Sequence, residues 1–434
     1  MGKDQVIIIV GGGTFGLSSA LHLGRRGYTN VKVFDPYTIP SPLSAGNDVN
    51  KIVDGGNLTT STDEGYVGTK LFAKTIKGWR EDPVFSPFYH ETGLIFAAST
   101  VEGESNLIAR YQPTSAMTKV ETAQGFRALM HEGALTGDFP GWRGWYKPGR
   151  AGSGYTEARR AMESAFREVK RLNVQFVTGP GAGEVVGLLY ESDEVRGVRT
   201  KDGLAHKADC VILAAGARSS ELFEFEQQLL PKCWTLAHIK LEPQERALYR
   251  GNPIMSNIER GFFMVDVESG ELKICNEFPG YTNFSVNPAT GRKESKVLHR
   301  HEIPKEAEER IRSYLSECMP HLAQRPFSFA RVCWCADTPD RGFLIGRHPV
   351  HKRLLFATGD SGRGFMHITS IGHFVVEALE GTLDPVIAKT WRWRPETAVE
   401  RDFAHPQKRM GGIRRPEDLG DVKGWTKGNK SSRL

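Results

Sequence analysis

A short apolar run that ends in a glycine-rich hexapeptide is the feature that most constrains this chain. Residues 5–10 read as a buried strand, and Gly11-Gly12-Gly13-Thr14-Phe15-Gly16 then fits G-x-G-x-x-G before a helix expected over Leu17 to Arg25. In this pattern Gly11 allows the tight turn, Gly13 lets a pyrophosphate approach the backbone, and Gly16 permits close helix–strand packing. Asp35 ends the next expected strand, where its carboxylate can accept ribose hydroxyls. The sequence therefore predicts a dinucleotide-binding β-α-β unit.

The choice of nucleotide follows from Asp35 and from two later motifs. Asp35 would repel a 2′-phosphate, which leaves FAD or NAD and excludes NADP. The N-terminal position of the unit, the string Ala214-Ala215-Gly216-Ala217 and the loop Thr358–Phe365 before a late helix all favour FAD. Backbone N–H groups of that loop would hold the electron-rich edge of a reduced flavin. NAD would leave the last two motifs without a role, so we expect FAD.

Composition excludes several other classes of protein. The 434 residues carry 57 Lys+Arg against 51 Asp+Glu, a net charge of 57 − 51 = +6 without long blocks of like charge, so we expect no nucleic-acid partner. No apolar stretch approaches the ~20 residues of a membrane-spanning helix, and the N-terminus lacks a secretion signal. The six cysteines lack zinc-ligand spacing, so neither a metal site nor a disulfide scaffold is expected.

The order of apolar patterns predicts a mixed α/β (α+β) fold with two domains. Residues 261–278 read as an antiparallel hairpin, whereas most other segments alternate between short apolar strands and helices. The further expected helices are 155–172, 305–318 and 369–380, and the further strands are 31–34, 174–177, 194–199, 210–216 and 353–359. We expect a discontinuous Rossmann-type FAD-binding domain at 1–85, 150–225 and 325–400, a substrate domain with an antiparallel sheet at 86–149 and 226–324, and a C-terminal tail at 401–434.

Five strings together resemble a known family of flavoenzymes. They are Ser44-Ala45-Gly46-Asn47-Asp48-Val49-Asn50-Lys51, Cys275-Asn276-Glu277-Phe278-Pro279-Gly280, Cys333-Trp334-Cys335-Ala336-Asp337-Thr338, Gly359-Asp360-Ser361-Gly362 and Trp391-Arg392-Trp393-Arg394-Pro395. Over about residues 5–400 the chain resembles the fungal fructosyl amino acid oxidases (amadoriases), within the wider family of monomeric sarcosine oxidase and pipecolate/saccharopine oxidase. The resemblance implies a flavoenzyme that oxidises the C–N bond of a secondary amino acid and passes electrons to oxygen.

The resemblance also implies roles for single residues. Cys333 matches the cysteine whose sulfur is bonded to the flavin 8α-methyl group, and Cys335 would face the substrate. Lys273 matches a lysine near flavin N5 that stabilises superoxide, and strand alternation puts Lys273, Cys275 and Glu277 on one face. Glu277 matches an acid that positions substrate, and Lys51 a basic residue against the flavin. The other residues expected to contact FAD are Gly11, Gly13, Thr14, Phe15, Gly16, Asp35, Ser44, Gly216, Asp360, Gly362, Arg363, Gly364, Phe365 and Met366.

The identity of the substrate depends on Met366. Members of the resembled family carry a lysine at this point of the loop, and Met366 can neither pair with a carboxylate nor donate to a sugar hydroxyl. The main expectation is therefore an N-substituted amino acid with an apolar substituent, such as an N-methyl amino acid. Fructosyl amino acids, saccharopine and pipecolate are the alternatives. His367 or Arg363 would replace the lost cation, and the substrate carboxylate would pair with an arginine among Arg363, Arg392, Arg394 and Arg409.

We expect the reaction to give an imine and hydrogen peroxide. The alternatives are a flavin dehydrogenase with another electron acceptor and a non-catalytic flavin-binding protein. The C-terminal tripeptide Ser432-Arg433-Leu434 is a close variant of a peroxisomal address, which suits a producer of peroxide. The expected partners are therefore a small-molecule amine, oxygen and the peroxisomal import receptor. We expect a monomer in the peroxisome, or in the cytoplasm if the address is not read.

Overall fold

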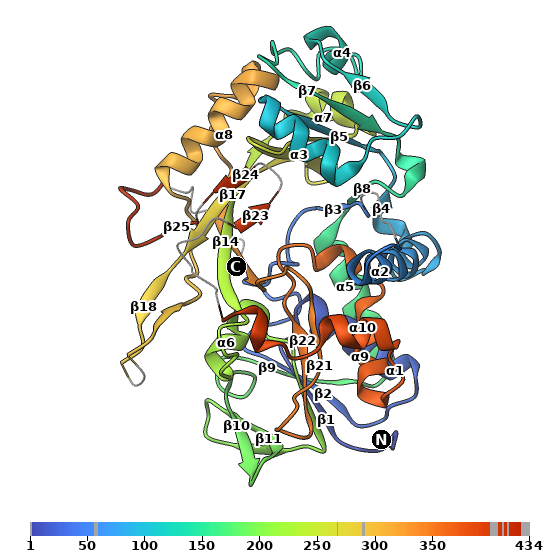
Figure 1. The fold of residues 1–434 in the computed structure, drawn as a ribbon, viewed down its shortest axis with the longest axis vertical. Coiled ribbons are helices and arrows are strands. Elements are labelled where there is room, and N and C mark those ends of the chain that lie inside the picture. The colour runs from blue at the N-terminus through green and yellow to red at the C-terminus, as the bar shows by residue number, and fades with distance from the viewer. Residues whose placement is uncertain are drawn as a thin grey trace.

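A computed structural model describes residues 2–55, 60–266, 268–288, 291–399, 407–409, 412–414 and 416–426 of this chain. Figure 1 shows a mostly parallel sheet in the lower half of the molecule and a larger, mainly antiparallel sheet in the upper half. This arrangement confirms the expected mixed α/β fold class. No helix of the described ranges is both long and apolar enough to cross a membrane.

The lower sheet is built from segments that lie far apart in the chain. Among the described residues it has six strands, in the order β21-β22-β13-β1-β2-β9. All neighbours are parallel except β21 and β22, which are antiparallel. The strands are β1 (Ile7–Val10), β2 (Val31–Asp35), β9 (Gln175–Thr178), β13 (Cys210–Leu213), β21 (Leu344–Arg347) and β22 (Leu354–Thr358).

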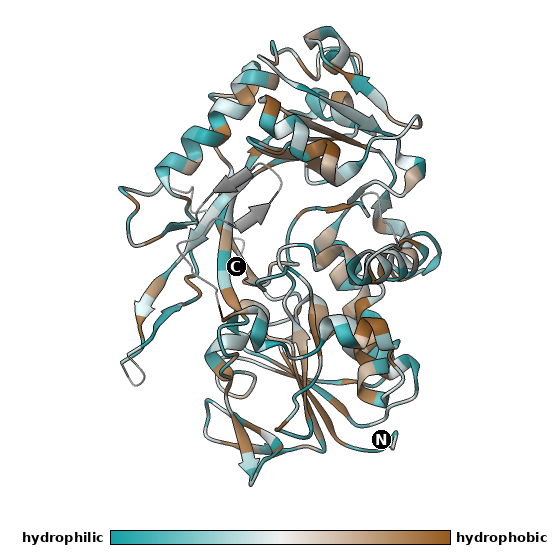
Figure 2. Cartoon of the chain, in the orientation of Figure 1, coloured by the Kyte–Doolittle hydropathy of each residue, from teal (hydrophilic) through white to brown (hydrophobic). Residues whose placement is uncertain are grey.

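Both faces of this sheet are covered, which explains why its central strands are apolar throughout. Ile7 and Ile9 of β1 pack against helices on one face, and Ile8 and Val10 pack against a small three-stranded sheet on the other. Figure 2 shows the resulting apolar strands in brown. The helices are α1 (Thr14–Arg25), α5 (Ala158–Arg171) and α9 (Ile371–Glu380), and the small sheet is β10 (Val185–Glu191), β11 (Glu194–Thr200) and β12 (Ala205–Lys207).

The upper sheet has nine strands within the described residues, in the order β20-β14-β17-β16-β15-β5-β7-β6, with β25 added beside β17. The expected hairpin at 261–278 forms its centre, as antiparallel β16 and β17. The strands are β5 (Leu94–Ala98), β6 (Thr118–Val120), β7 (Arg143–Lys147), β14 (Leu230–Lys240), β15 (Ile254–Asn257), β16 (Gly261–Asp266), β17 (Glu271–Thr282), β20 (Phe329–Asp337) and β25 (Glu417–Asp418).

Helices cover the two faces of the upper sheet. On one face α8 (Lys305–Cys318) buries Ile311 and Tyr314 against β17 and its neighbours, and its outward side is hydrophilic (Figure 2). On the other face α3 (Val101–Tyr111) buries Leu107 against β5. Shorter helices near this sheet are α4 (Ala123–Arg127) and α7 (Pro243–Tyr249).

The remaining described elements connect the two sheets or decorate their edges. They are α2 (Asp63–Glu81), α6 (Ser219–Leu222), α10 (Pro385–Trp391), β3 (Lys51–Val53), β4 (Tyr89–His90), β8 (Gly154–Thr156), β18 (Phe284–Val286), β19 (Lys293–Ser295), β23 (Gln407–Arg409), β24 (Gly412–Arg414), and short 3-10 turns at Ser86–Phe88, Gly149–Ala151, Gly216–Arg218, Pro320–Leu322, Phe365–His367 and Pro395–Thr397. Strand β20 pairs with β14 although it lies in the segment 325–400 expected for the FAD domain. The domain boundaries themselves stay a prediction.

Candidate functional site

A cavity of about 1020 Å³ is lined by residues of both sheets and of α2. This volume is at the upper end of the roughly 300–1,000 Å³ typical of small-molecule sites. Its wall includes the turn after β1, the end of β2 and residues 214–218 after β13. It also includes apolar and aromatic residues of the upper sheet and of α2, namely Val67, Leu71, Phe72, Leu94, Tyr111, Phe262 and Met264.

The glycines of the hexapeptide serve two different purposes. Gly11 has φ +99°, and a methyl group there would lie 2.6 Å from the Ala214 carbonyl oxygen. A methyl group on Gly16 would lie 1.8 Å from the Gly11 carbonyl oxygen, so Gly16 lets α1 start directly against β1. Gly13 lines the cavity, where a methyl group would meet only the Ser44 hydroxyl, at 3.4 Å. Gly11 and Gly16 are thus required by packing, and Gly13 keeps backbone open to a ligand.

The first turn of α1 and Asp35 fit the phosphate and ribose chemistry of FAD. Helix α1 begins at Thr14 without a side-chain cap, so its first N–H groups are available to a phosphate at the cavity wall. Asp35 accepts the Gly12 N–H at 2.9 Å and the Tyr37 N–H at 3.0 Å, which fixes its carboxylate at the cavity edge. Burial raises the pKa of Asp35.

The loop after β22 is fastened to β20 through Asp360. The Asp360 carboxylate accepts the Ala336 N–H at 3.0 Å and the Gly362 N–H at 2.8 Å, and burial raises its pKa to about 6. A methyl group on Gly362 would lie 1.7 Å from the Trp234 ring, so the glycine is needed for packing. Gly364 meets Phe15 and Asp360 in the same way. The N–H groups of Gly362 and Arg363 are thus engaged inside the loop, with Asp360.

A buried carboxylate holds two lysines of the cavity wall. Asp48 lies 2.6 Å from the Lys273 ammonium and 2.9 Å from that of Lys51, and Lys273 also donates to the Asn50 carbonyl at 2.8 Å. Both lysines line the cavity. Burial alone would raise the pKa of Asp48, but Lys273 and Lys51 hold it well below its usual range. Conversely, against the opposing effect of burial, Asp48 raises the pKa of Lys51. The cavity wall therefore carries fixed positive charge.

Three cysteines line the cavity beside these lysines. Cys275 and Lys273 both reach it from β17, as strand alternation predicts for residues two apart. Cys333 and Cys335 reach it from β20, where Cys333 is half-buried opposite Trp234 and Cys335 is buried opposite Lys232. The backbone of Glu277 lies in β17, but its side chain is outside the described part of the structure.

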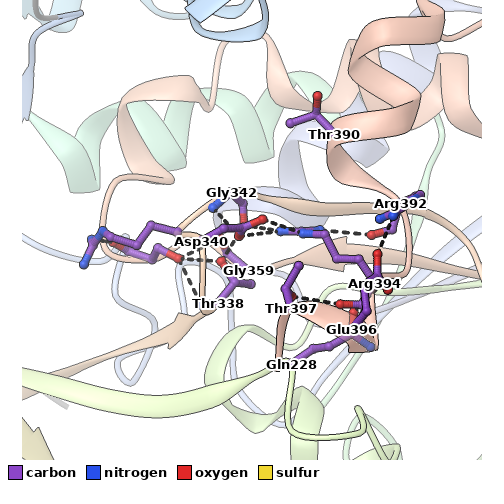
Figure 3. A network of polar contacts seen from close by, with 12 residues as sticks. Gln228, Thr338, Asp340, Gly342, Gly359, Thr390, Arg392, Arg394, Glu396 and Thr397 are labelled. Atoms are coloured by element: carbon purple, nitrogen blue, oxygen red, sulfur yellow. Dashed lines mark hydrogen bonds and ion pairs between the residues drawn. The ribbon is translucent and has the colours of Figure 1, made fainter. Parts of the chain in front are cut away.

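Arg394 is held by a network of hydrogen bonds and an ion pair (Figure 3). Its guanidinium makes a two-point contact with Asp340, at 2.6 Å from Nε and 2.8 Å from Nη2, and also donates to the Gly342 and Arg392 carbonyls. The buried Arg394 is not among the residues that line the cavity. Of the four arginines that were candidates for the substrate carboxylate, Arg394 is disfavoured by the structure, because Asp340 already takes its two-point hydrogen-bonding edge. Arg392 instead pairs with Glu396 at the surface.

The residues around Met366 show which side chain can supply the positive charge that Met366 lacks. Met366 lines the cavity, and its carbonyl accepts the Trp79 indole N–H at 2.6 Å. His367 contacts the Thr75 hydroxyl at 2.7 Å, and burial lowers its pKa to about 3. It is therefore neutral near pH 7 and does not replace the cation, contrary to one expectation. Arg363 lines the cavity while donating to the Arg341 carbonyl at 2.6 Å. The side chain of Arg409 lies outside the described residues.

Sequence reasoning missed two buried groups of the site. Asp48 lies in the string Ser44–Lys51, which was used only for the family resemblance. Its position three residues before Lys51 could have indicated that the two side chains pair. His238 lies in β14, next to Asp48 and Glu271, and nothing in its local sequence indicates that position. Within the described residues there is no group of three or more His, Cys, Asp or Glu side chains suited to a metal ion.

Comparison with known proteins assigns the family. The sequence profile of the family described as FAD dependent oxidoreductase matches residues 7–378. The chain belongs to this family. It is therefore an FAD-dependent oxidase of amino acids that acts on CH–NH bonds.

Solved structures and curated sequences give the nearer relatives. The chain is similar to the deglycating enzyme fructosamine oxidase (Amadoriase II) of Aspergillus fumigatus in complex with FSA, at 45% identity over 99% of both chains with a TM-score of 0.94. It is also similar to the fructosyl amine:oxygen oxidoreductase (Amadoriase I) of the same fungus, at 46% identity over 99% of both chains with a TM-score of 0.94. L-saccharopine oxidase of Schizosaccharomyces pombe is 26% identical over 91% of this chain and 94% of that protein.

Proposed function

We propose that this oxidase acts on fructosyl amino acids and removes the sugar from the amino group. The carrying observation is the 45% identity over 99% of the chain to a deglycating enzyme whose structure holds FSA. This ranking reverses the expectation based on Met366, which placed N-methyl amino acids first. A single lost contact in the loop weighs less than 45% identity over 99% of the chain.

The overall reaction converts a secondary amine and oxygen into an imine and hydrogen peroxide. When bound, FAD supplies the acceptor for the hydrogen on the carbon beside the amine nitrogen and returns the electrons to oxygen. The glycine turn and the first turn of α1 would bind its phosphates, and Asp35 would bind its ribose. Lys273 and Lys51, fixed by Asp48, hold positive charge where oxygen becomes negative during reduction. The apolar part of the cavity wall excludes water from the amine until the imine leaves for hydrolysis.

The attachment of FAD to Cys333 belongs to the same proposal. Cys333 lies in the cavity wall, in the strand that Asp360 joins to the loop Thr358–Phe365, called the flavin loop below. A thioether to the flavin 8α carbon would fix the cofactor relative to Lys273. Cys335 is two residues further along β20 and also lines the cavity, so it stays the candidate for contact with substrate.

The substrate is tested by peroxide release from the purified holoenzyme with three classes of amine. We expect the highest kcat/KM for a fructosyl amino acid, a lower value for N-methyl amino acids, and little turnover of saccharopine or pipecolate. Met366→Lys should raise kcat/KM for the fructosyl substrate, because the new ammonium can reach a carboxylate or hydroxyl in the cavity. Oxidation of N-methyl amino acids without oxidation of fructosyl amino acids would instead support the second candidate, which Met366 favours.

A further inference from the structure

A second, small cavity lies next to Asp48. Its volume is about 20 Å³, and it is bordered by Asp48, His238, Arg331, His301, Phe329 and Arg159, among others. Lys273 and Lys51 border the large cavity instead, and Asp48 contacts both of them. Asp48 therefore stands between the two spaces. His301, at the border of the small cavity, is exposed to solvent.

A row of polar atoms joins the small cavity to Lys273. The Glu271 carboxylate lies 3.3 Å from His238 Nδ1, His238 Nε2 lies 3.8 Å from Asp48 Oδ1, and Asp48 Oδ2 lies 2.6 Å from Lys273 Nζ. All four side chains are buried. Among the described residues, His238 Nε2 has no hydrogen-bond partner.

The gap between His238 and Asp48 suits one water molecule. A separation of 3.8 Å is too long for a direct hydrogen bond. A polar cavity of about 20 Å³ can hold one water, which needs roughly 10–15 Å³ of this measure and two to four polar partners. His238 Nε2 and Asp48 Oδ1 are two such partners, so a water there would complete a chain of hydrogen bonds.

The oxidase reaction needs a proton at this place. Reduction of oxygen to hydrogen peroxide takes two electrons and two protons. The reduced cofactor would supply both electrons and one of these protons. The second proton balances the proton that the amine nitrogen releases when the amine becomes an imine. It must reach the reduced oxygen from solvent or through side chains of the protein.

We propose that His238, oriented by Glu271, delivers this second proton through Asp48 to Lys273, by way of the small cavity. His238 Nδ1 donates to Glu271, which leaves Nε2 to carry the transferred proton toward Asp48. The Lys273 ammonium gives a proton to the reduced oxygen in the large cavity and regains one along the row. His238 does not line the large cavity, so it acts on the reduced oxygen only through Lys273.

Other charged groups near His238 are held by separate contacts. Arg331 donates to the Asn47 carbonyl at 3.0 Å and the Pro42 carbonyl at 3.3 Å. Arg159 donates to the Asn47 side chain at 2.7 Å. Burial lowers the pKa of His301. These hydrogen bonds of the two arginines lie outside the row of side chains that joins His238 to Lys273.

The first experiment isolates the return of electrons to oxygen. The flavin of the holoenzyme is reduced with light and a sacrificial donor, without amine, and its reoxidation by oxygen is followed by stopped flow in H₂O and D₂O. We expect His238→Gln to slow reoxidation about 100-fold and to bring out a solvent isotope effect of about three that the unaltered enzyme lacks. Glu271→Gln should move both values in the same direction by less. Because no amine is present, a wrong substrate assignment does not affect the result.

The matched control is His22→Gln. His22 of α1 is a half-buried imidazole that lies 3.1 Å from the Thr369 carbonyl, and it lines neither cavity. If His238→Gln slows reoxidation no more than His22→Gln does, or leaves the isotope effect unchanged, the proposal is wrong.

A second measurement needs no turnover and does not depend on how well His238→Gln folds. In protein labelled with ¹⁵N-histidine, Asp48→Asn should shift the His238 Nε2 resonance and Glu271→Gln should shift the Nδ1 resonance. Neither change should shift the His22 resonances. The absence of a His238 Nε2 shift in Asp48→Asn would contradict the coupling on which the relay depends.

Discussion

Lys273 and Cys333 line one cavity, but they are held there in different ways. Lys273 is fully buried and fixed by Asp48 and the Asn50 carbonyl, whereas Cys333 is half-buried in a strand that faces Trp234. A fixed charge suits electrostatic stabilisation, since it needs no rearrangement when oxygen is reduced. A partly open thiol suits a covalent bond to a ligand. Each residue can therefore be tested by a different variant.

Lys273→Met should slow reoxidation of the reduced flavin about 100-fold and change its reduction by substrate less than about threefold. The methionine fills the space of the lysine stem but removes one of the two lysine charges that Asp48 holds in the cavity wall. Stopped-flow measurement of the two half-reactions separates the effects. Lys147→Met is the matched control, since Lys147 is a buried lysine 2.7 Å from Asp54 that does not line the cavity. Equal slowing of both half-reactions would contradict the role of Lys273.

Cys333→Ala should release FAD when the protein is denatured in acid, whereas the unaltered protein should keep the yellow colour on the polypeptide. Absorbance of the precipitate and of the supernatant measures the two fractions. Cys335→Ala is the control, because Cys335 lies on the same strand and lines the same cavity. If flavin absorbance stays with denatured Cys333→Ala but is released from denatured Cys335→Ala, FAD is attached to Cys335 instead.

At the scale of elements, contacts with several neighbouring elements hold the flavin loop in place. Asp360 joins it to β20, and the ring of Trp234 from β14 packs against Gly362. His367 joins it to α2 through Thr75. Next to the loop, Arg394 holds residues 340–342 through Asp340 and the Gly342 carbonyl (Figure 3). These contacts predict that the shape of the cavity depends on groups outside it.

Arg394→Ala should lower the free energy of unfolding by about 2–3 kcal/mol, because Asp340 loses the partner of a two-point charged contact. Arg394→Lys should recover little of it, since an ammonium cannot replace the planar fork. Urea titration of the holoenzyme measures both. Arg392→Ala is the control: its pair with Glu396 is about half exposed on each side and should contribute less than about 1 kcal/mol. A rise in KM alone, with the free energy of unfolding unchanged, would indicate that Arg394 binds the substrate.

The neutral His367 predicts a loss of stability in mild acid. Its pKa is lowered from 6.5 to about 3, so below pH 6.5 the unfolded chain binds a proton that the folded chain does not. The free energy of unfolding should therefore fall as the pH drops from 6.5 toward 3, by up to about 1.4 kcal/mol per pH unit from this group. Urea midpoints between pH 7 and 4.5 should fall less steeply for His367→Gln than for the unaltered protein or the exposed-site control His131→Gln. Equal slopes would contradict the assignment.

Several elements could be predicted because their signals are local. Helix α8 follows the period of its apolar residues, and the hairpin of β16 and β17 follows the turn at Ser269 and Gly270. Strand β14 was missed because it is buried along ten of its eleven residues and so shows no alternation. The misplacement of Arg394 has another cause, since its partner Asp340 is 54 residues away in sequence. The His238–Asp48 contact likewise joins β14 to the loop before β3.

At the scale of the whole molecule, the C-terminal address remains to be tested. Ser432-Arg433-Leu434 lies outside the described residues. Deletion of these three residues from a fluorescent fusion should move it from catalase-containing bodies to the cytoplasm, because the import receptor reads an exposed C-terminus. Deletion of Met1 to Lys3 is the control. Import that survives the C-terminal deletion would exclude this address, and a mass by light scattering near 48.2 kDa would support the expected monomer.

The strand order of the lower sheet has a consequence for how the protein is made. Strand β1 pairs with β13, and β13 pairs with β22, so the sheet combines residues 7–10 with residues 354–358. During synthesis the N-terminal half of the cofactor cradle leaves the ribosome more than 300 residues before β22 can join it. Such distant pairing is slow and leaves apolar strands exposed meanwhile. FAD can therefore be captured only after nearly the whole chain is made, and chains that end before β22 should aggregate rather than bind it.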